Sequence, residues 1–87
     1  MEEVATNTWL SRIKRRVSDE HWDIIFPMLS GVYKIYEGHN HIKLEFFAGT
    51  DITVVLPRVY HLQIILHKTV IIPFNGTLIT MSEDWRI

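Results

Sequence analysis

The sequence predicts a single α+β domain in which one or two N-terminal helices pack on a strongly curved antiparallel meander of five or six strands, which can close into a small barrel. Two observations predict this class. Apolar residues recur at helical spacing within residues 1–31, and from residue 32 to residue 81 short alternating runs are separated by turn residues. With 87 residues the chain has the length of one domain, so we expect no second one.

A first helix is predicted after residues 1–5, which we expect to fray. A threonine or asparagine within residues 6–8 can cap it. Its apolar side chains fall on one stripe, formed by Trp9, Leu10, Ile13 and Val17. The other side is basic and carries Arg12, Arg15 and Arg16. This pattern predicts an amphipathic helix with a basic side.

A second helix is predicted to begin after Ser18, whose side chain can cap it. Asp19 and Glu20 follow in the first turn, where the helix dipole favours negative charge. The apolar stripe of this helix comprises Trp22, Ile25, Phe26 and Leu29. Pro27 clashes with the preceding turn and leaves a carbonyl unpaired, so we expect a kink or an early stop there. Ser30-Gly31 is predicted to end the helical part of the chain.

The predicted sheet begins with a hairpin that joins residues 32–37 to a strand starting at His41, around the loop of residues 38–40. The predicted pairs are Tyr36 with Ile42, Lys34 with Leu44, and Val32 with Phe46. This register points Lys34 toward the core, which requires that it lie near an open end of the sheet.

Residues 52–66 are predicted to form the next two strands. A three-residue loop at residues 48–50 pairs Phe46 with Ile52, and a corner at residues 57–59 pairs Leu56 with Tyr60. Residues paired directly across two neighbouring strands point to the same side of the sheet, so these pairs determine which side chains face inward. The inward-facing set comprises Ile52, Val54, Leu56, Tyr60, Leu62, Ile64 and Leu66.

A last hairpin is predicted around Asn75-Gly76, the residue pair typical of a type I′ turn. Val70, Ile72 and Phe74 precede the turn on the inner side, and the chain returns through Thr77, Ile79 and Met81. Pro73 donates no ladder hydrogen bond, so its strand should be an edge, or its amide position should face away from the neighbouring strand. Residues 82–87 form a polar tail, in which we expect Trp85 to fold back on the domain.

Composition excludes several classes of function. The net charge of −1 creates no strong field that would attract nucleic acid, and no apolar run approaches the ~18 residues of a membrane helix. The N-terminus lacks the layout of a signal peptide, so we expect a cytoplasmic protein. Since there is no cysteine, disulfides, thiol nucleophiles and zinc–thiolate sites are excluded.

Neither a metal site nor a catalytic site is predicted, and we expect no cofactor. Five histidines are present, but the predicted register separates His61 from His67 by roughly 20 Å, too far to share a zinc ion. No nucleophile, base and orienting group share a local motif, and the four glycines are isolated turn residues. We therefore expect a protein that is not an enzyme.

The outer side of the predicted sheet holds most of the candidate contact residues. Two neighbouring rows are predicted, Lys43, Val55 and His61 in one and Glu45, Thr53 and Gln63 in the other. This face is either solvated or binds a partner. Ile71 and Leu78 are predicted to join Ile65 in an apolar patch, which is either covered by a helix or used as a subunit or partner interface.

These observations favour a non-catalytic protein-interaction module that masks or bridges a partner, as an inhibitor, an adaptor or an assembly subunit. An accessory protein of a phage or virus would fit this size, and we expect self-association through the C-terminal hairpin. The alternative is a small oligomeric β-barrel that binds RNA or DNA through the basic helix side. The candidate contact residues are Arg12, Arg15, Arg16, Lys43, His61, Gln63, Ile71 and Leu78.

Overall fold

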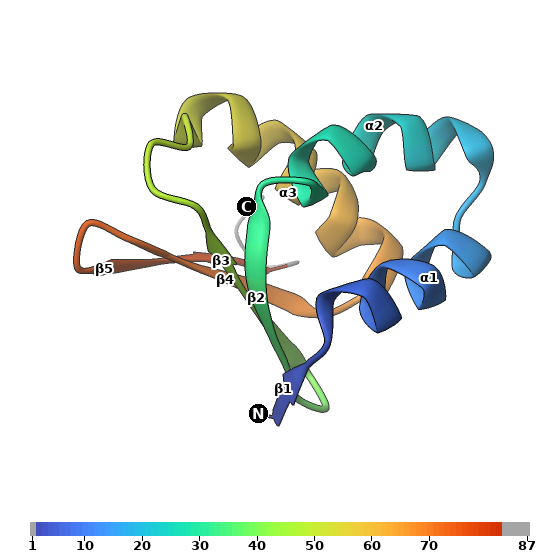
Figure 1. The fold of residues 1–87 in the computed structure, drawn as a ribbon, viewed down its shortest axis with the longest axis horizontal. Coiled ribbons are helices and arrows are strands. Elements are labelled where there is room, and N and C mark those ends of the chain that lie inside the picture. The colour runs from blue at the N-terminus through green and yellow to red at the C-terminus, as the bar shows by residue number, and fades with distance from the viewer. Residues whose placement is uncertain (1, 83–87) are drawn as a thin grey trace.

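The computed structural model describes residues 2–82, and the expectation for Trp85 lies outside these residues. In chain order the elements are β1 (Glu2–Val4), α1 (Thr6–Arg16), α2 (Asp19–Leu29), β2 (Val32–Glu37), β3 (His41–Phe46), α3 (Ile52–Leu66), β4 (Thr69–Phe74) and β5 (Thr77–Met81). The five strands lie side by side in sequence order. All three helices lie on one side of this sheet (Figure 1), so the described part of the chain is an α+β fold of two layers.

The sheet is mixed and open, which corrects the prediction of an antiparallel meander that can close into a barrel. β3 and β4 pair in parallel, whereas every other neighbouring pair of strands is antiparallel. The edges are β1 and β5, and they do not pair with each other. β1 is itself a correction, because the segment expected to fray pairs with β2, where Glu3 lies opposite Tyr36.

The two N-terminal helices follow the predicted amphipathic patterns. In α1, Trp9 and Ile13 are buried, but the residue at the N-cap is Ala5 and not one of residues 6–8. In α2, the Ser18 hydroxyl accepts a hydrogen bond from the His21 backbone N–H at 3.3 Å, so the predicted cap is confirmed. The helix continues through Pro27 to Leu29, with Ser30 as its C-cap, so the expected early stop is wrong and the predicted end at Ser30-Gly31 is confirmed.

The β2–β3 hairpin contains a bulge that the predicted register lacked. Val32 lies opposite Phe46 as predicted, but the register shifts between Val32 and Lys34, and Lys34 then lies opposite Glu45. The extra residue turns the Lys34 side chain out to solvent. The predicted pairs of Tyr36 with Ile42 and of Lys34 with Leu44 are therefore each wrong by one position.

Residues 52–66 form helix α3 and not two strands. Their buried side chains recur at intervals of three and four residues: Val55, Val59, Leu62, Gln63 and Leu66. Val54 and Ile64, which the strand interpretation pointed inward, are 56% and 39% exposed. Asp51 caps the helix by accepting the Thr53 backbone N–H at 3.0 Å, and His67 ends it in the left-handed conformation, with φ of 54°.

The β4–β5 hairpin confirms the predicted turn and register. Asn75 and Gly76 both have positive φ, 50° and 77°, as a type I′ turn requires. Phe74 lies opposite Thr77, so Pro73 belongs to a pair without mutual hydrogen bonds and its nitrogen faces the β3 side. β4 is not an edge strand, but β3 pairs with it only as far as Ile71. Because no strand lies beside Pro73 on that side, its lack of a backbone N–H breaks no hydrogen bond of the sheet.

The helical state of α3 can be tested by comparing two substitutions that the strand interpretation treats alike. Leu62 is fully buried, so Leu62→Ala should lower the free energy of unfolding by about 2–5 kcal/mol. Ile64→Ala should lower it by clearly less, about 1 kcal/mol, because Ile64 is 39% exposed and leaves no enclosed cavity when truncated. Urea unfolding of both variants measures the difference. Equal losses would contradict the helix.

Candidate binding surface

The structure gathers only part of the predicted contact set. Lys43, Ile71 and Leu78 lie on the side of the sheet opposite the helices, as expected. His61 and Gln63 instead belong to α3, so their predicted rows with sheet residues are wrong. The same correction applies to Val55, Thr53 and Ile65, which also lie on α3.

Gln63 was a predicted contact residue, but its place on a helix buries it. The residue is 1% exposed, and its Oε1 has no hydrogen-bond partner among the described residues. It occupies the inner side of α3 and is not available to a partner. His61 is exposed on the same helix, beside an open groove of about 590 Å³ whose lining is otherwise Thr53, Leu56, Pro57, Tyr60 and Met81.

The sheet side opposite the helices is here called the open face. The strand register aligns one row of side chains across all five strands: Glu3, Tyr36, Lys43, Ile71 and Thr80. The open face also includes Tyr33, Lys34, Glu45, Phe47, Pro73 and Leu78. Inward-facing neighbours such as Ile35, Ile42 and Val70 are fully buried under the helices. The alternation of side chains along each strand therefore separates the core from this second surface.

Aromatic side chains from β2 and the segment after β3 form an exposed pair on the open face. The rings of Tyr33 and Phe47 lie 5.3 Å apart, and these residues are 43% and 57% exposed. The Tyr33 hydroxyl donates a hydrogen bond to Glu45 Oε1 at 3.4 Å. The bulge leaves Tyr33 and Lys34 exposed in succession, which adds a side chain to this surface. The sequence contained no signal for that bulge.

The charges of the open face are mixed and nearly balanced. Lys43 Nζ lies 4.5 Å from the centroid of the Tyr36 ring, a cation–π contact. Tyr36 first, and then Glu3 and Glu45, raise the pKa of Lys34 above its ordinary value. Each lysine on this face is thus close to an acidic or aromatic group. Such a surface does not attract a polyanion strongly.

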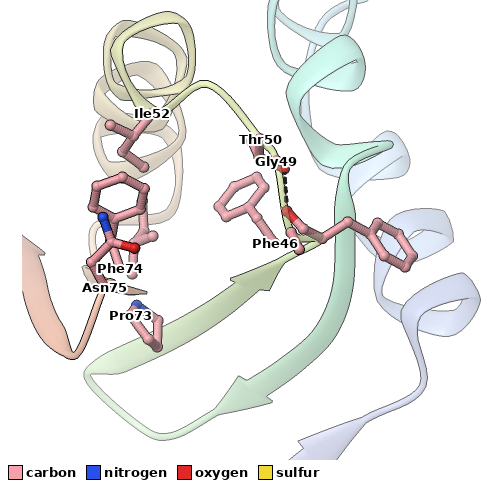
Figure 2. Close-up of a pocket in the computed structure, with 10 residues that line it drawn as sticks. Phe46, Gly49, Thr50, Ile52, Pro73, Phe74 and Asn75 are labelled. Carbon is pink, nitrogen blue, oxygen red and sulfur yellow. Dashed lines mark hydrogen bonds between the residues drawn. The ribbon is translucent and has the colours of Figure 1, made fainter.

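A cavity of about 250 Å³ opens where β3 and β4 diverge beyond their paired ends (Figure 2). Phe46, Ile52 and Phe74 line it, and the Thr50 hydroxyl beside it donates to the Phe47 carbonyl at 2.6 Å. None of its lining residues titrates near neutral pH. The cavity can hold an apolar group, but its lining offers no acid or base that would activate the Thr50 hydroxyl, which donates to the Phe47 carbonyl.

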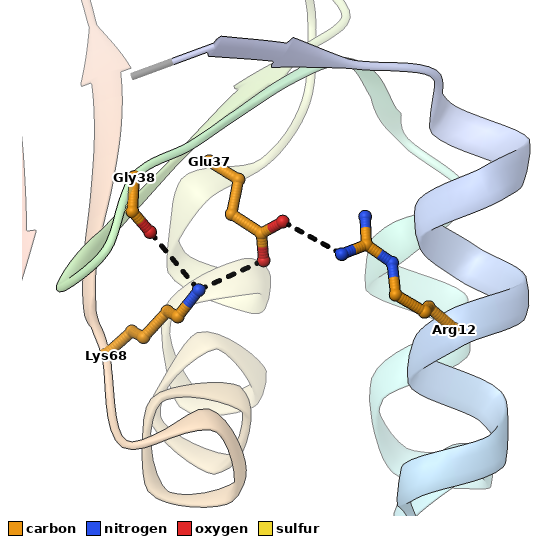
Figure 3. Close-up of polar contacts among 4 residues, drawn as sticks. All are labelled: Arg12, Glu37, Gly38 and Lys68. Atoms are coloured by element: carbon orange, nitrogen blue, oxygen red, sulfur yellow. Dashed lines mark hydrogen bonds and ion pairs between the residues drawn. The ribbon is translucent and has the colours of Figure 1, made fainter.

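The basic side of α1 is only partly free. Arg12 Nη1 donates to Glu37 Oε1 at 3.2 Å, and Lys68 Nζ donates to Glu37 Oε2 at 3.1 Å and to the Gly38 carbonyl at 3.2 Å (Figure 3). Glu37 thereby links α1, the β2–β3 turn and the start of β4. Arg12, a predicted contact residue, therefore has a structural partner, whereas Arg15 and Arg16 are exposed.

Within residues 2–82, no three His, Asp or Glu side chains are grouped so that they could hold a metal ion. No helix in this part of the chain has the length and apolar content to cross a bilayer. No protein-family model, curated protein or solved structure matches the chain. Function must therefore be argued from the geometry of this surface.

The Glu37 cluster should make stability depend on pH. Burial raises the pKa of Glu37, but the hydrogen bonds and charges of Lys68 and Arg12 outweigh it and hold the pKa below the ordinary 4.5. A lowered folded-state pKa gives stability that is present above the ordinary pKa and lost as pH falls through the lowered one. Near neutral pH, Glu37→Gln should lower the free energy of unfolding by roughly 1–2 kcal/mol.

Urea unfolding at a series of pH values measures this effect for the wild type and Glu37→Gln in parallel. The difference between the two proteins should shrink as pH falls from about 4.5 through the lowered pKa of Glu37, because the unfolded chain takes up the proton first and the folded wild type only at lower pH. Other carboxylates such as Asp51 titrate equally in both proteins and cancel. A difference that stays constant down to the lowest pH would contradict the cluster's role.

Proposed function

We propose that the protein is a non-catalytic interaction module that masks or bridges a partner protein, and that it binds this partner through the open face. The observation that carries the proposal is the exposed pair of contacting aromatic rings, Tyr33 and Phe47, on a sheet side that no described helix covers. Aromatic side chains, tyrosine above all, contribute much of the binding energy at protein interfaces.

The apolar residues of the open face extend beyond this aromatic pair. Ile71 and Pro73 continue the surface on β4, and Leu78 on β5 is 63% exposed. Lys34, Lys43 and Glu45 lie between the two apolar parts. A complementary partner is a folded protein surface with an apolar centre and both signs of charge around it.

The charge balance favours a protein partner over a nucleic acid. A nucleic-acid surface gains affinity from several unpaired cations that neutralise phosphates. Lys43 contacts Tyr36, and Lys34 lies opposite Glu45, so the cations of the open face are already compensated. On α1 the exposed Arg12 guanidinium is already paired with Glu37, while Arg15 and Arg16 are the other exposed arginines of the predicted set.

The test uses a double variant of the open face and a matched double variant of the basic side. Partners captured from a lysate of the native host are identified by mass spectrometry, purified, and titrated by calorimetry against each protein. Tyr33→Ala with Phe47→Ala should weaken binding at least about tenfold, because both rings would be removed from the contact. Arg15→Glu with Arg16→Glu should leave the Kd within about twofold.

The same variants distinguish the nucleic-acid alternative. Binding of random single-stranded oligonucleotides that weakens steeply with salt and disappears in the double arginine variant would overturn the proposal. A captured protein whose Kd is unchanged by the aromatic double variant would also overturn it. Circular dichroism of each variant checks that the fold is retained, since all four side chains are exposed.

A further inference from the structure

We infer that β5 is a self-pairing edge, through which two copies of the chain join their sheets in antiparallel orientation. This inference does not depend on the proposed partner protein, because it is carried by the backbone of β5 and not by the open face. It also refines the expected self-association through the C-terminal hairpin by naming the strand and its register.

The two edges of the sheet differ in their protection against pairing. β1 has three residues, and two of them are Glu2 and Glu3, so a second copy would meet it with like charges. β5 has five residues without charge or proline, and no charged residue occurs from Thr69 to Ser82. Charged, short or proline-containing edge strands are the usual protection against association, and β5 has none of these features.

The register of the hairpin determines which backbone groups of β5 remain unpaired. In a two-residue type I′ hairpin the residues flanking the turn exchange both hydrogen bonds, so Thr77 directs its N–H and C=O toward Phe74. The alternation continues along the strand, and Ile79 bonds back to Ile72. Leu78 and Thr80 therefore direct their N–H and C=O groups away from β4. No other described strand pairs with that side.

The outward N–H and C=O groups of Leu78 and Thr80 can pair with the same groups of a second copy of β5. If a two-fold axis passes beside Ile79 of both copies, Leu78 of one copy lies opposite Thr80 of the other. Each such pair exchanges two hydrogen bonds, so all the outward backbone groups of Leu78 and Thr80 find partners. The exposed Leu78 side chain then covers Thr80 of the second copy on the open face. Within β5 itself, Thr77–Met81, no charged side chain enters the contact.

The joined sheet would be twice as wide, and the two open faces would form one continuous surface. A contact made by one short strand is smaller than a standard protein interface, so the dimer should be weak and dependent on concentration. Figure 1 shows the β4–β5 hairpin projecting from one side of the fold.

The test measures solution mass by sedimentation velocity from about 5 µM to about 0.5 mM, a range that spans weak association. The wild type should shift from monomer to dimer. Thr80→Pro removes one outward N–H and places a ring on the edge, so it should stay monomeric over the whole range. Thr80→Val keeps the N–H and should dimerise like the wild type. A dimer that persists in Thr80→Pro would overturn the inference.

Hydrogen exchange of the wild type gives a second readout that needs no variant. Raising the concentration should slow exchange of the Leu78 and Thr80 amides at least tenfold relative to dilute protein. The Thr77 and Ile79 amides, already bonded within the hairpin, serve as internal controls and should change much less. If the wild type remains monomeric and these two amides exchange equally at every concentration, β5 does not pair with itself.

Discussion

The packing of α3 on the inner side of β3 and β4 is the constraint on which the other features depend. The helix connects two adjacent strands, which therefore run parallel, and it buries Val59 and Leu62 in the same core as Ile42 and Ile72. α1 and α2 complete this layer with Trp9 and Ile25. Because every described helix is used on one side, the other side of the sheet is exposed to solvent.

Local turn chemistry made part of the fold predictable. Asn75-Gly76 determined the turn and register of the last hairpin, and Ser18 determined the start of α2. Residues 52–66 were not predictable in this way, because β-branched and apolar residues there fit both a period of two and a helical period. Pro57 was interpreted as a strand corner, but the protein accommodates it within α3.

The candidate surface was predictable only where strands were assigned correctly. Lys43, Ile71 and Leu78 were placed on the correct side of the sheet, because their strands alternate as expected. Gln63 was placed on the wrong side, because it belongs to a helix and not to a strand, and the helix turns its side chain into the core. Lys34 was placed on the wrong side, because a single inserted residue in β2, which no motif indicates, turns its side chain to the open face. Tyr33 faces outward in the predicted and the observed register alike, but nothing in the sequence distinguished it as a contact residue.

The parallel contact between β3 and β4 also has a consequence for the order of folding. It brings together His41 and Thr69, which are far apart in sequence, whereas both antiparallel hairpins close through short turns. Loop-closure entropy makes contacts distant along the chain slower to form than local ones. The two hairpins are therefore the natural early units, and their docking through α3 is the step expected to limit the folding rate.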